Sequence, residues 1–364
     1  MKKNHIFNML YLLIYSFVAL FSCSEDSDDH EFYNTDSAFI KGNEITLPTF
    51  SVPTVVFANY DNESTSHDNI RVSAPSIVQV ADDLFYMYYE CYGTGSFSND
   101  EKDLELAFAF SEDGFNWKRE IPEGIESPVD GTNLIFDWRI DKEMVIGIDV
   151  VKVNDPIYPY RMIGSKGKNM AQTICLWKSK DGVHFEQMRV LLNAKYDSKV
   201  SIIVRGNVLK VYLRMRENGG NTTRQIGVMY IDLEGKVLSP PTTLFGDYYY
   251  QAGASIIDDR RELLLPTYYD EKSDKNWYDA FVVDGTKIIH LDTNINEALI
   301  NPEKDGWGIV CPKIITIGFE QYIYYMQWNY THGKKMIGNE SNKKTEIRCS
   351  KITWDIKGKP YKQF

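Results

Sequence analysis

Three carboxylates lie where predicted β-strands begin or end. Asp149 lies at the start of one strand, and Glu90 and Glu217 come at the ends of two others. Two such carboxyl groups in an apolar, tyrosine-lined pocket would have different pKa values, so that one could donate a proton while the other acts as a base. The pattern therefore predicts acid–base chemistry, with all three acids as candidate catalytic residues. The structural alternatives are a strand-end cap for Asp149, a packed-edge ion pair for Glu90 and a solvated loop acid paired with Arg216 for Glu217.

Arginines accompany these acids at the strand ends. Arg71 lies at the start of a predicted first strand, and Arg214 and Arg216 lie at the end of a second strand. A guanidinium binds a carboxylate through two parallel hydrogen bonds, so these side chains predict recognition of an acidic ligand group. Internal salt bridges are the alternative for one or two of them.

Other side chains at the same strand ends complete the candidate binding site: Gln251, Tyr250, Tyr269, His332 and Trp328. His332 lies on a loop bounded by glycine and could donate a proton, although a surface histidine is the alternative. Trp328 could stack on a ligand ring or fill a seam between sheets. Tyr250 belongs to a run of three tyrosines that alternate between core and pocket, because neighbours on a strand point to opposite sides.

The elements that must position these residues are four-stranded antiparallel units. Residues 71–120 contain four short runs of β-branched or aromatic residues, each stopped by Asp, Asn, Ser or Gly. Such runs are typical of an antiparallel meander. The same order returns in units that begin near residues 144, 199, 251 and 308. A recurring four-stranded sheet predicts a β-propeller, here with five blades.

A turn motif marks the third-to-fourth strand connection of these units. Ser-Glu-Asp-Gly at 111–114 is followed by Trp117, and Ser-Lys-Asp-Gly at 179–182 is followed by Phe185. Asp and Gly supply the turn and the aromatic side chain plugs the sheet, so we interpret the motif as structural.

The propeller brings the candidate residues to one face. In each blade the first strand starts where the second strand ends, so both sets of residues surround the central funnel. The first-strand starts are 71–74, 148–149, 197–199, 250–251 and 310–311, and the second-strand ends are 90–92, 165–166, 216–218, 268–270 and 329–332.

Composition narrows the class of ligand. The net charge is −11, which argues against a nucleic-acid duplex as partner. The aromatic content of 13% suits carbohydrate, because Tyr and Trp faces stack on sugar rings. Cys91, Cys175, Cys311 and Cys349 are widely spaced, which predicts buried free thiols, with neither a metal site nor a disulfide framework. We expect no cofactor and a monomeric chain.

The N-terminus predicts export and lipidation. Lys2 and Lys3 precede an apolar run at 6–21, and Cys23 follows it. This pattern resembles a bacterial lipoprotein signal, which would occupy 1–22 and leave Cys23 as the site of lipid attachment. The acidic run at 24–29 predicts a solvated tether over 23–44 and resembles the surface-export signal of Bacteroidetes lipoproteins. We therefore expect a lipid-anchored protein of the outer membrane and cell surface; an ordinary secretory signal is the alternative.

The whole pattern resembles the five-bladed propeller glycosidases related to glycoside hydrolase families 43 and 32. The residues that carry the resemblance are the five units, Pro-Ser-Ile-Val at 75–78 before a Tyr-rich strand, and the Ser-x-Asp-Gly turn with its aromatic residue. It implies an all-β, five-bladed propeller of four-stranded antiparallel blades over residues 45–364.

The family's acidic motifs are only partly kept. Its Arg-Asp-Pro of blade one becomes Ser-Ala-Pro at 73–75, which places Ala74 where the usual base stands. Its Ile-Asp-Pro of blade two resembles Ile-Asp-Val at 148–150, and its blade-three Glu is absent from 197–199.

The resemblance implies a glycoside hydrolase acting on a complex polysaccharide or oligosaccharide at the cell surface, with an acidic glycan as one option. The missing blade-one Asp motivates an alternative, a non-catalytic glycan-binding lipoprotein on the same fold. A structural or assembly partner is a third hypothesis.

Overall fold

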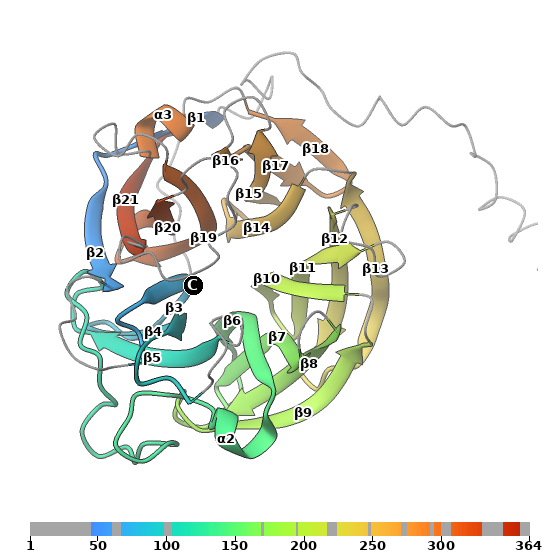
Figure 1. The fold of residues 1–364 in the computed structure, drawn as a ribbon. Coiled ribbons are helices and arrows are strands. Elements are labelled where there is room, and N and C mark those ends of the chain that lie inside the picture. The colour runs from blue at the N-terminus through green and yellow to red at the C-terminus, as the bar shows by residue number, and fades with distance from the viewer. Residues whose placement is uncertain are drawn as a thin grey trace, which may run out of the picture.

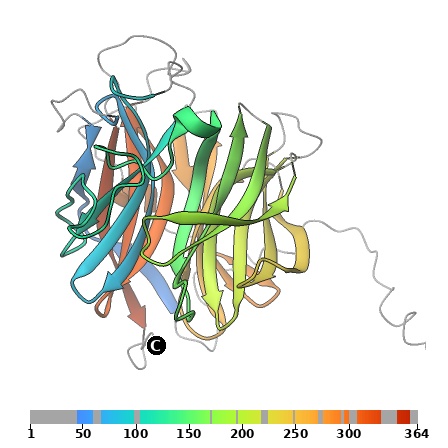
Figure 2. The same ribbon diagram turned by 90° about the horizontal axis from the view of Figure 1, so that it is seen from below.

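The computed structural model describes residues 45–59, 67–97, 104–168, 171–193, 196–216, 224–246, 249–270, 275–291, 295–299, 307–329 and 345–356. Antiparallel sheets stand around a common axis, with one strand of each sheet facing the centre (Figure 1). The strands run along that axis (Figure 2). The five-bladed β-propeller expected from the sequence is therefore confirmed. No described helix is both long and apolar enough to span a bilayer.

The blades follow one another along the chain, each starting at the axis. Blade one contains β3 (Arg71–Ala81), β4 (Leu84–Tyr92) and β5 (Glu105–Ser111). Blade two contains β6 (Met144–Lys152), β7 (Tyr160–Lys168), β8 (Ala171–Ser179) and β9 (Phe185–Leu192). Blade three contains β10 (Tyr196–Arg205), β11 (Val208–Arg216), β12 (Arg224–Asp232) and β13 (Val237–Phe245).

The last two blades carry additional pieces. Blade four contains β14 (Tyr249–Ile256), β15 (Arg261–Asp270), β17 (Phe281–Asp284) and β18 (Lys287–His290), and β16 (Lys275–Tyr278) also pairs with β15. Blade five contains β19 (Trp307–Ile317), β20 (Glu320–Asn329) and β21 (Thr345–Ile356). Two short helices, α2 (Trp138–Asp141) and α3 (Ile295–Leu299), lie between blades in the chain.

The ring is closed by strands from opposite parts of the chain. Both β1 (Ile45–Phe50) and β2 (Thr54–Ala58) pair antiparallel with β21, so they form the outer edge of blade five. The contact joins the first described strands to the last blade and leaves no open seam there (Figure 1).

Blade one differs from its expected form at the outer edge. The sequence predicts a fourth strand at 116–120, but among the described residues only the isolated bridge between Phe110 and Lys118 forms there. A second bridge joins Ala107 to Leu134. The chain over 112–134 thus runs beside β5 without forming a regular strand.

The core is divided among the seams between neighbouring blades. Each of five described apolar clusters combines residues from two adjacent blades. The second strand of a blade contributes side chains to the seams on both sides of that blade. In blade one, Tyr88 packs toward blade two, whereas Tyr89 packs toward blade five. This alternation explains why β4 and β20 are rich in tyrosine, since both faces of these strands are buried.

The Ser-x-Asp-Gly turns also join blades. Gly182 accepts a hydrogen bond from the Tyr88 hydroxyl of blade one at 2.6 Å, and Gly114 accepts one from the Tyr324 hydroxyl of blade five at 2.6 Å. Within the first turn, the Asp113 carboxylate accepts the backbone N–H groups of residues 115 and 116. Burial opposes this effect, but these hydrogen bonds lower the pKa of Asp113 to about 2. The structural interpretation of the motif is consistent with these contacts.

Candidate functional site

The five innermost strands share an irregularity at the same level. In each, the pairing with the second strand shifts by one or two residues, as expected of a β-bulge. Four of these bulges contain a residue with positive φ, namely Ala74, Gly147, Lys199 and Cys311. Bulges redirect side chains, so this level of the propeller sets which residues face the axis.

The register changes the equivalence inferred from the sequence. Before the bulge, Ser73 pairs with Glu90, and Ile146 pairs with Ser165. The bulge residue of blade two is therefore Gly147, the counterpart of Ala74. Asp149 lies two residues further along, at the level of Ser76 in blade one and Lys313 in blade five. Asp149 therefore lies one layer beyond Gly147, and its match to the family's blade-two acid stays a prediction.

Asp149 joins four blades at the axis. Its side chain is 2% exposed, and its Oδ1 accepts hydrogen bonds from Ser76 Oγ at 2.8 Å and from Lys313 Nζ at 2.5 Å. Its Oδ2 accepts the backbone N–H of Ile202 at 2.8 Å. A buried carboxylate needs such partners because its desolvation is costly. The contacts give Asp149 a structural role; its catalytic assignment stays a prediction.

Glu90 reaches the axis from β4 and is 1% exposed. Its Oε1 accepts the Gly147 backbone N–H at 2.7 Å and faces Lys199 Nζ at 3.3 Å. Burial alone would raise the pKa of Glu90, but Lys199, Arg71 and the Gly147 N–H outweigh it and hold that pKa below its ordinary value. A low pKa keeps the group ionised, which suits a base or an ion pair and does not suit a proton donor.

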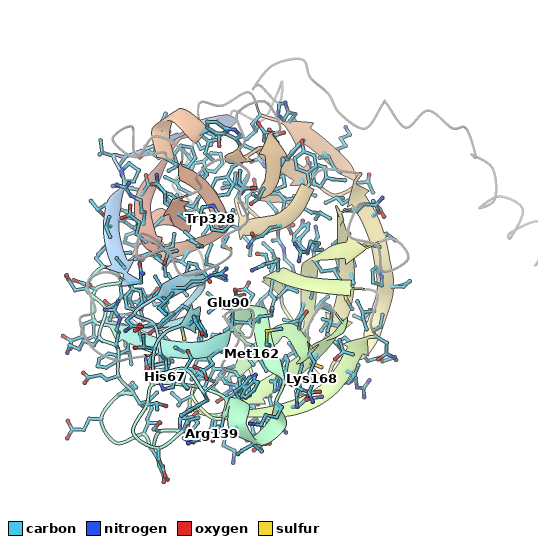
Figure 3. The ribbon with its side chains drawn as sticks, in the orientation of Figure 1. His67, Glu90, Arg139, Met162, Lys168 and Trp328 are labelled. Atoms are coloured by element: carbon cyan, nitrogen blue, oxygen red, sulfur yellow. The ribbon has the colours of Figure 1, made fainter. Side chains whose placement is uncertain are left out.

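Cations surround Glu90. Burial lowers the pKa of Lys199, and Arg214 and Arg71 lower it further, but Glu90 and Cys311 together outweigh these effects and raise the pKa above its ordinary value. Lys199 therefore stays protonated and lies within the electrostatic reach of both arginines. Figure 3 places Glu90 near the centre of the ring.

A small axial cavity lies between the bulges. It has a volume of about 20 Å³ and is lined by residues of all five innermost strands, including Ala74, Asp149, Lys199, Gln251 and Lys313. That volume is about the room of one water molecule, so side chains fill most of the axis at this level.

The other predicted site residues fall into two groups. Gln251 faces the axis, where its Oε1 accepts the Cys311 backbone N–H at 3.2 Å. Trp328 packs against a cluster that contains Ala74 and Cys311, on the blade-five side of the axis (Figure 3). Tyr250, Tyr269 and Arg216 lie on β14, β15 and β11, and their side chains are not described. Glu217, His332 and Cys23 lie outside the described residues.

Sequence reasoning missed the two lysines that hold the carboxylates. Lys199 and Lys313 are the ion-pair partners of Glu90 and Asp149. The signal was present as Ala-Pro-Ser at 74–76 and Cys-Pro-Lys at 311–313, which share a proline after the bulge residue. Aligning these two strings would have placed Lys313 level with Ser76.

Blade one also carries a histidine contact on the face where β3 begins. His67 Nδ1 lies 2.7 Å from Glu105 Oε2, and the Glu105 side chain is fully buried. Glu105 Oε1 also accepts the Phe97 backbone N–H at 2.8 Å. The contact between His67 and Glu105 connects the segment before β3 to the start of β5.

Comparison with known proteins identifies relatives by structure alone. No protein-family model and no curated protein sequence matches this chain. A thermostable family-43 glycoside hydrolase superposes with a TM-score of 0.58 and 13% identity, covering 80% of this chain and 95% of its own. A member of the GH130 family has a TM-score of 0.54 and 12% identity, and the match covers 83% of this chain and 94% of that protein. That family is described as mannoside phosphorylases that include glycoside hydrolases acting on β-1,2 mannosidic linkages in Candida mannan.

A glycosyl hydrolase from Bacteroides ovatus is similar over a larger part of the chain. Its TM-score is 0.51 and its identity 11%, and the match covers 90% of this chain and 95% of that protein. At these identities the likeness establishes the fold and not the activity. This chain therefore has the propeller fold of known glycoside hydrolases, including one of family 43.

Proposed function

We propose that the axial face of the propeller binds a glycan and does not cleave it with Glu90 and Asp149. The observation that carries this proposal is the pairing of both axial carboxylates with lysines, Glu90 with Lys199 and Asp149 with Lys313. Glycoside hydrolysis uses one carboxylic acid that is protonated at working pH and one that is ionised. The environment of Glu90 favours its ionised form, and Asp149 already accepts three hydrogen bonds from other blades.

Carbohydrate is the ligand class that the remaining observations favour. The fold is shared with glycoside hydrolases, and the chain is aromatic-rich and acidic overall. Trp328 lies beside the axial cluster, where an indole can support a sugar ring.

Hydrolysis is the second candidate. Glu217 directly follows β11, the strand that brings Arg214 beside Lys199. The strand β11 belongs to the third blade, where the family resemblance implies a catalytic glutamate. Glu217 would then act as the proton donor, with Glu90 as the ionised partner.

A panel of acidic and neutral plant and host glycans separates the two candidates. We expect binding by the mature chain without release of sugar, and weaker binding after Trp328→Ala. Released sugar that disappears in Glu90→Gln or Asp149→Asn variants that still fold would contradict the proposal. Release that disappears in Glu217→Gln would establish the second candidate.

We further propose that the protein is anchored through lipid on Cys23 and displayed at the cell surface. The basic and apolar leader before Cys23 and the acidic run after it support this location. In cells, the wild-type chain should partition with the outer membrane and be accessible to external protease. Cys23→Ser should abolish lipid labelling. Continued labelling in that variant would refute the assignment.

A further inference from the structure

We propose that Gly308 positions the Trp328 indole beside the axis, where the indole forms an apolar platform that selects pyranose rings over furanose rings. This inference rests on the proposed glycan binding and specifies a positioning residue and a ligand class for that site. It follows from strand pairing, burial and the space around Gly308.

Trp328 lies at the open end of the axial site. It packs against an apolar cluster that contains Ala74 of blade one and Cys311 of blade five. Both of these residues also line the axial cavity. Met326 pairs with Val310 beside the bulge, and Trp328 lies two residues further toward the strand end. At about 3.3 Å per residue, Trp328 is roughly 7 Å above the bulge, where a ring too large for the cavity must lie.

Gly308 leaves room for the indole. It pairs directly with Trp328 and belongs to β19, the innermost strand of blade five. Residues that pair across an antiparallel sheet point to the same side, and an aromatic side chain can cover a glycine that it faces. A Cβ on Gly308 would lie 3.1 Å from Trp328 Nε1, so the edge of the indole reaches over β19 toward the axis.

The backbone itself does not require glycine at position 308. The φ of Gly308 lies outside the left-handed region, so other residues can adopt this conformation. Gly308 is buried, and an added Cβ would also come within 3.3 Å of the Asn276 backbone N on β16. A side chain at 308 must therefore displace the indole or β16. The indole yields more readily, because a side chain rotates more easily than a paired strand moves.

The indole favours one class of sugar ring. Trp328 is partly exposed, and an aromatic face accepts the apolar side of a sugar ring. A pyranose chair turns several parallel C–H bonds to one side, whereas a furanose is smaller and puckered and offers no comparable apolar face. The axial cavity, with a volume of about 20 Å³, holds about one water molecule, so the ring must rest on the platform above it.

Calorimetric titration of residues 24–364 with defined tetrasaccharides tests the ligand class. The pyranose probes are cellotetraose, β-1,4-mannotetraose and tetragalacturonic acid, and the furanose probe is α-1,5-arabinotetraose. We expect the best pyranose probe to bind about tenfold more tightly than arabinotetraose, the size of effect that a stacked ring supplies.

Variants of Gly308 test the positioning. Gly308→Val should weaken the best pyranose probe about fivefold, since it displaces the stacking face. Gly308→Ala should do so to a smaller extent, which keeps the test available if the valine variant fails to fold. Gly246→Val is the matched control, because Gly246 also lies outside the left-handed region and no described atom is within 4 Å of its added Cβ. Thermal unfolding checks the fold of each variant.

Two further measurements separate positioning from a purely structural role. In a Trp328→Ala background, Gly308→Val should cause no further loss of binding, because the platform is already absent. Fluorine NMR of the chain labelled with 5-fluorotryptophan reports on its seven tryptophans, and the signal that vanishes in Trp328→Phe belongs to Trp328. That signal should shift in Gly308→Val without ligand, and in the wild type when the best pyranose probe is added.

The outcomes distinguish this inference from the proposed function. Binding of a pyranose probe that Trp328→Ala weakens and both Gly308 variants leave unchanged would overturn the positioning role and leave glycan binding intact. Arabinotetraose binding as tightly as the pyranose probes would overturn the ligand class alone. Failure of all four tetrasaccharides to bind would overturn the ligand class, and the wider glycan panel would then decide the proposed function by itself.

Discussion

At the scale of single residues, the axis is governed by ion pairs between distant parts of the chain. Lys313 and Asp149 are separated by 164 positions, yet their side chains meet at 2.5 Å. The sequence predicted that Asp149 and Glu90 approach the axis, because strand ends converge in a propeller. It could not predict their lysine partners, because such pairing depends on the register of strands in different blades.

We expect Lys313→Met to destabilise the protein by about 3–5 kcal/mol, because it leaves the Asp149 carboxylate buried without its countercharge. Denaturant unfolding measures this change. Lys351→Met provides the matched control, since Lys351 and its partner Glu320 are both exposed, and its effect should be much smaller. Adding Asp149→Asn to Lys313→Met should cost less than the sum of the single changes. Strict additivity would show that the two side chains do not interact.

Glu90 should give the stability a defined pH dependence. Its folded-state pKa lies below the value of 4.5 for the free side chain, so its contacts stabilise the fold above about pH 4.5. This contribution is lost as the pH falls through the folded-state pKa. The difference in unfolding free energy between wild type and Glu90→Gln should therefore be largest near neutral pH and shrink in acid. A difference that increases toward low pH would contradict the ion pair.

At the scale of the elements, the bulges decide which side chains reach the axis. The alternation of side chains along a strand predicts which residues face the axis only while the pairing register is regular. Each bulge inserts an extra residue or two and so shifts that register. This is why the sequence grouped Asp149 with the starts of the first strands, whereas the structure places it at the level of Ser76, two residues beyond Gly147, the counterpart of Ala74. The turn motif, by contrast, could be interpreted from sequence because its geometry is local.

Gly182 tests the role of the turn motif between blades. Its φ is +78°, and a Cβ there would lie 3.0 Å from the Tyr86 ring of the neighbouring blade. Gly206 has φ +60° but no atom within 4 Å of such a Cβ, so Gly206→Ala isolates the backbone strain. We expect Gly206→Ala to destabilise by about 1 kcal/mol and Gly182→Ala by about 1–3 kcal/mol more, measured by denaturant unfolding. Equal effects would mean that the seam tolerates the added methyl group.

At the scale of the whole molecule, closure of the ring depends on strands from both ends of the described chain. The sequence predicted the five units because tyrosine-rich second strands recur in a fixed order. It missed the loss of a regular fourth strand in blade one, where only the Phe110–Lys118 bridge remains among the described residues.

Removing β1 and β2 should open the ring. A chain that begins at residue 60 exposes the edge of β21 and loses Phe57, which is 3% exposed. We expect a loss of roughly several kcal/mol, a large part of the stability of an ordinary domain, and a tendency to associate through the open edge. A chain that begins at residue 45 is the control and should melt like the mature protein. Unchanged melting of the shorter chain would show that closure through β1 and β2 is dispensable.

The central claim is that the axial face of the propeller binds a glycan and leaves it uncleaved by Glu90 and Asp149. A crystal structure of residues 24–364 with the oligosaccharide that binds most tightly in the glycan panel tests it most directly. We predict an intact oligosaccharide at the axial face, with a sugar ring against Trp328. A ligand bound away from the axis, or one cleaved beside Glu90 and Asp149, would contradict the account.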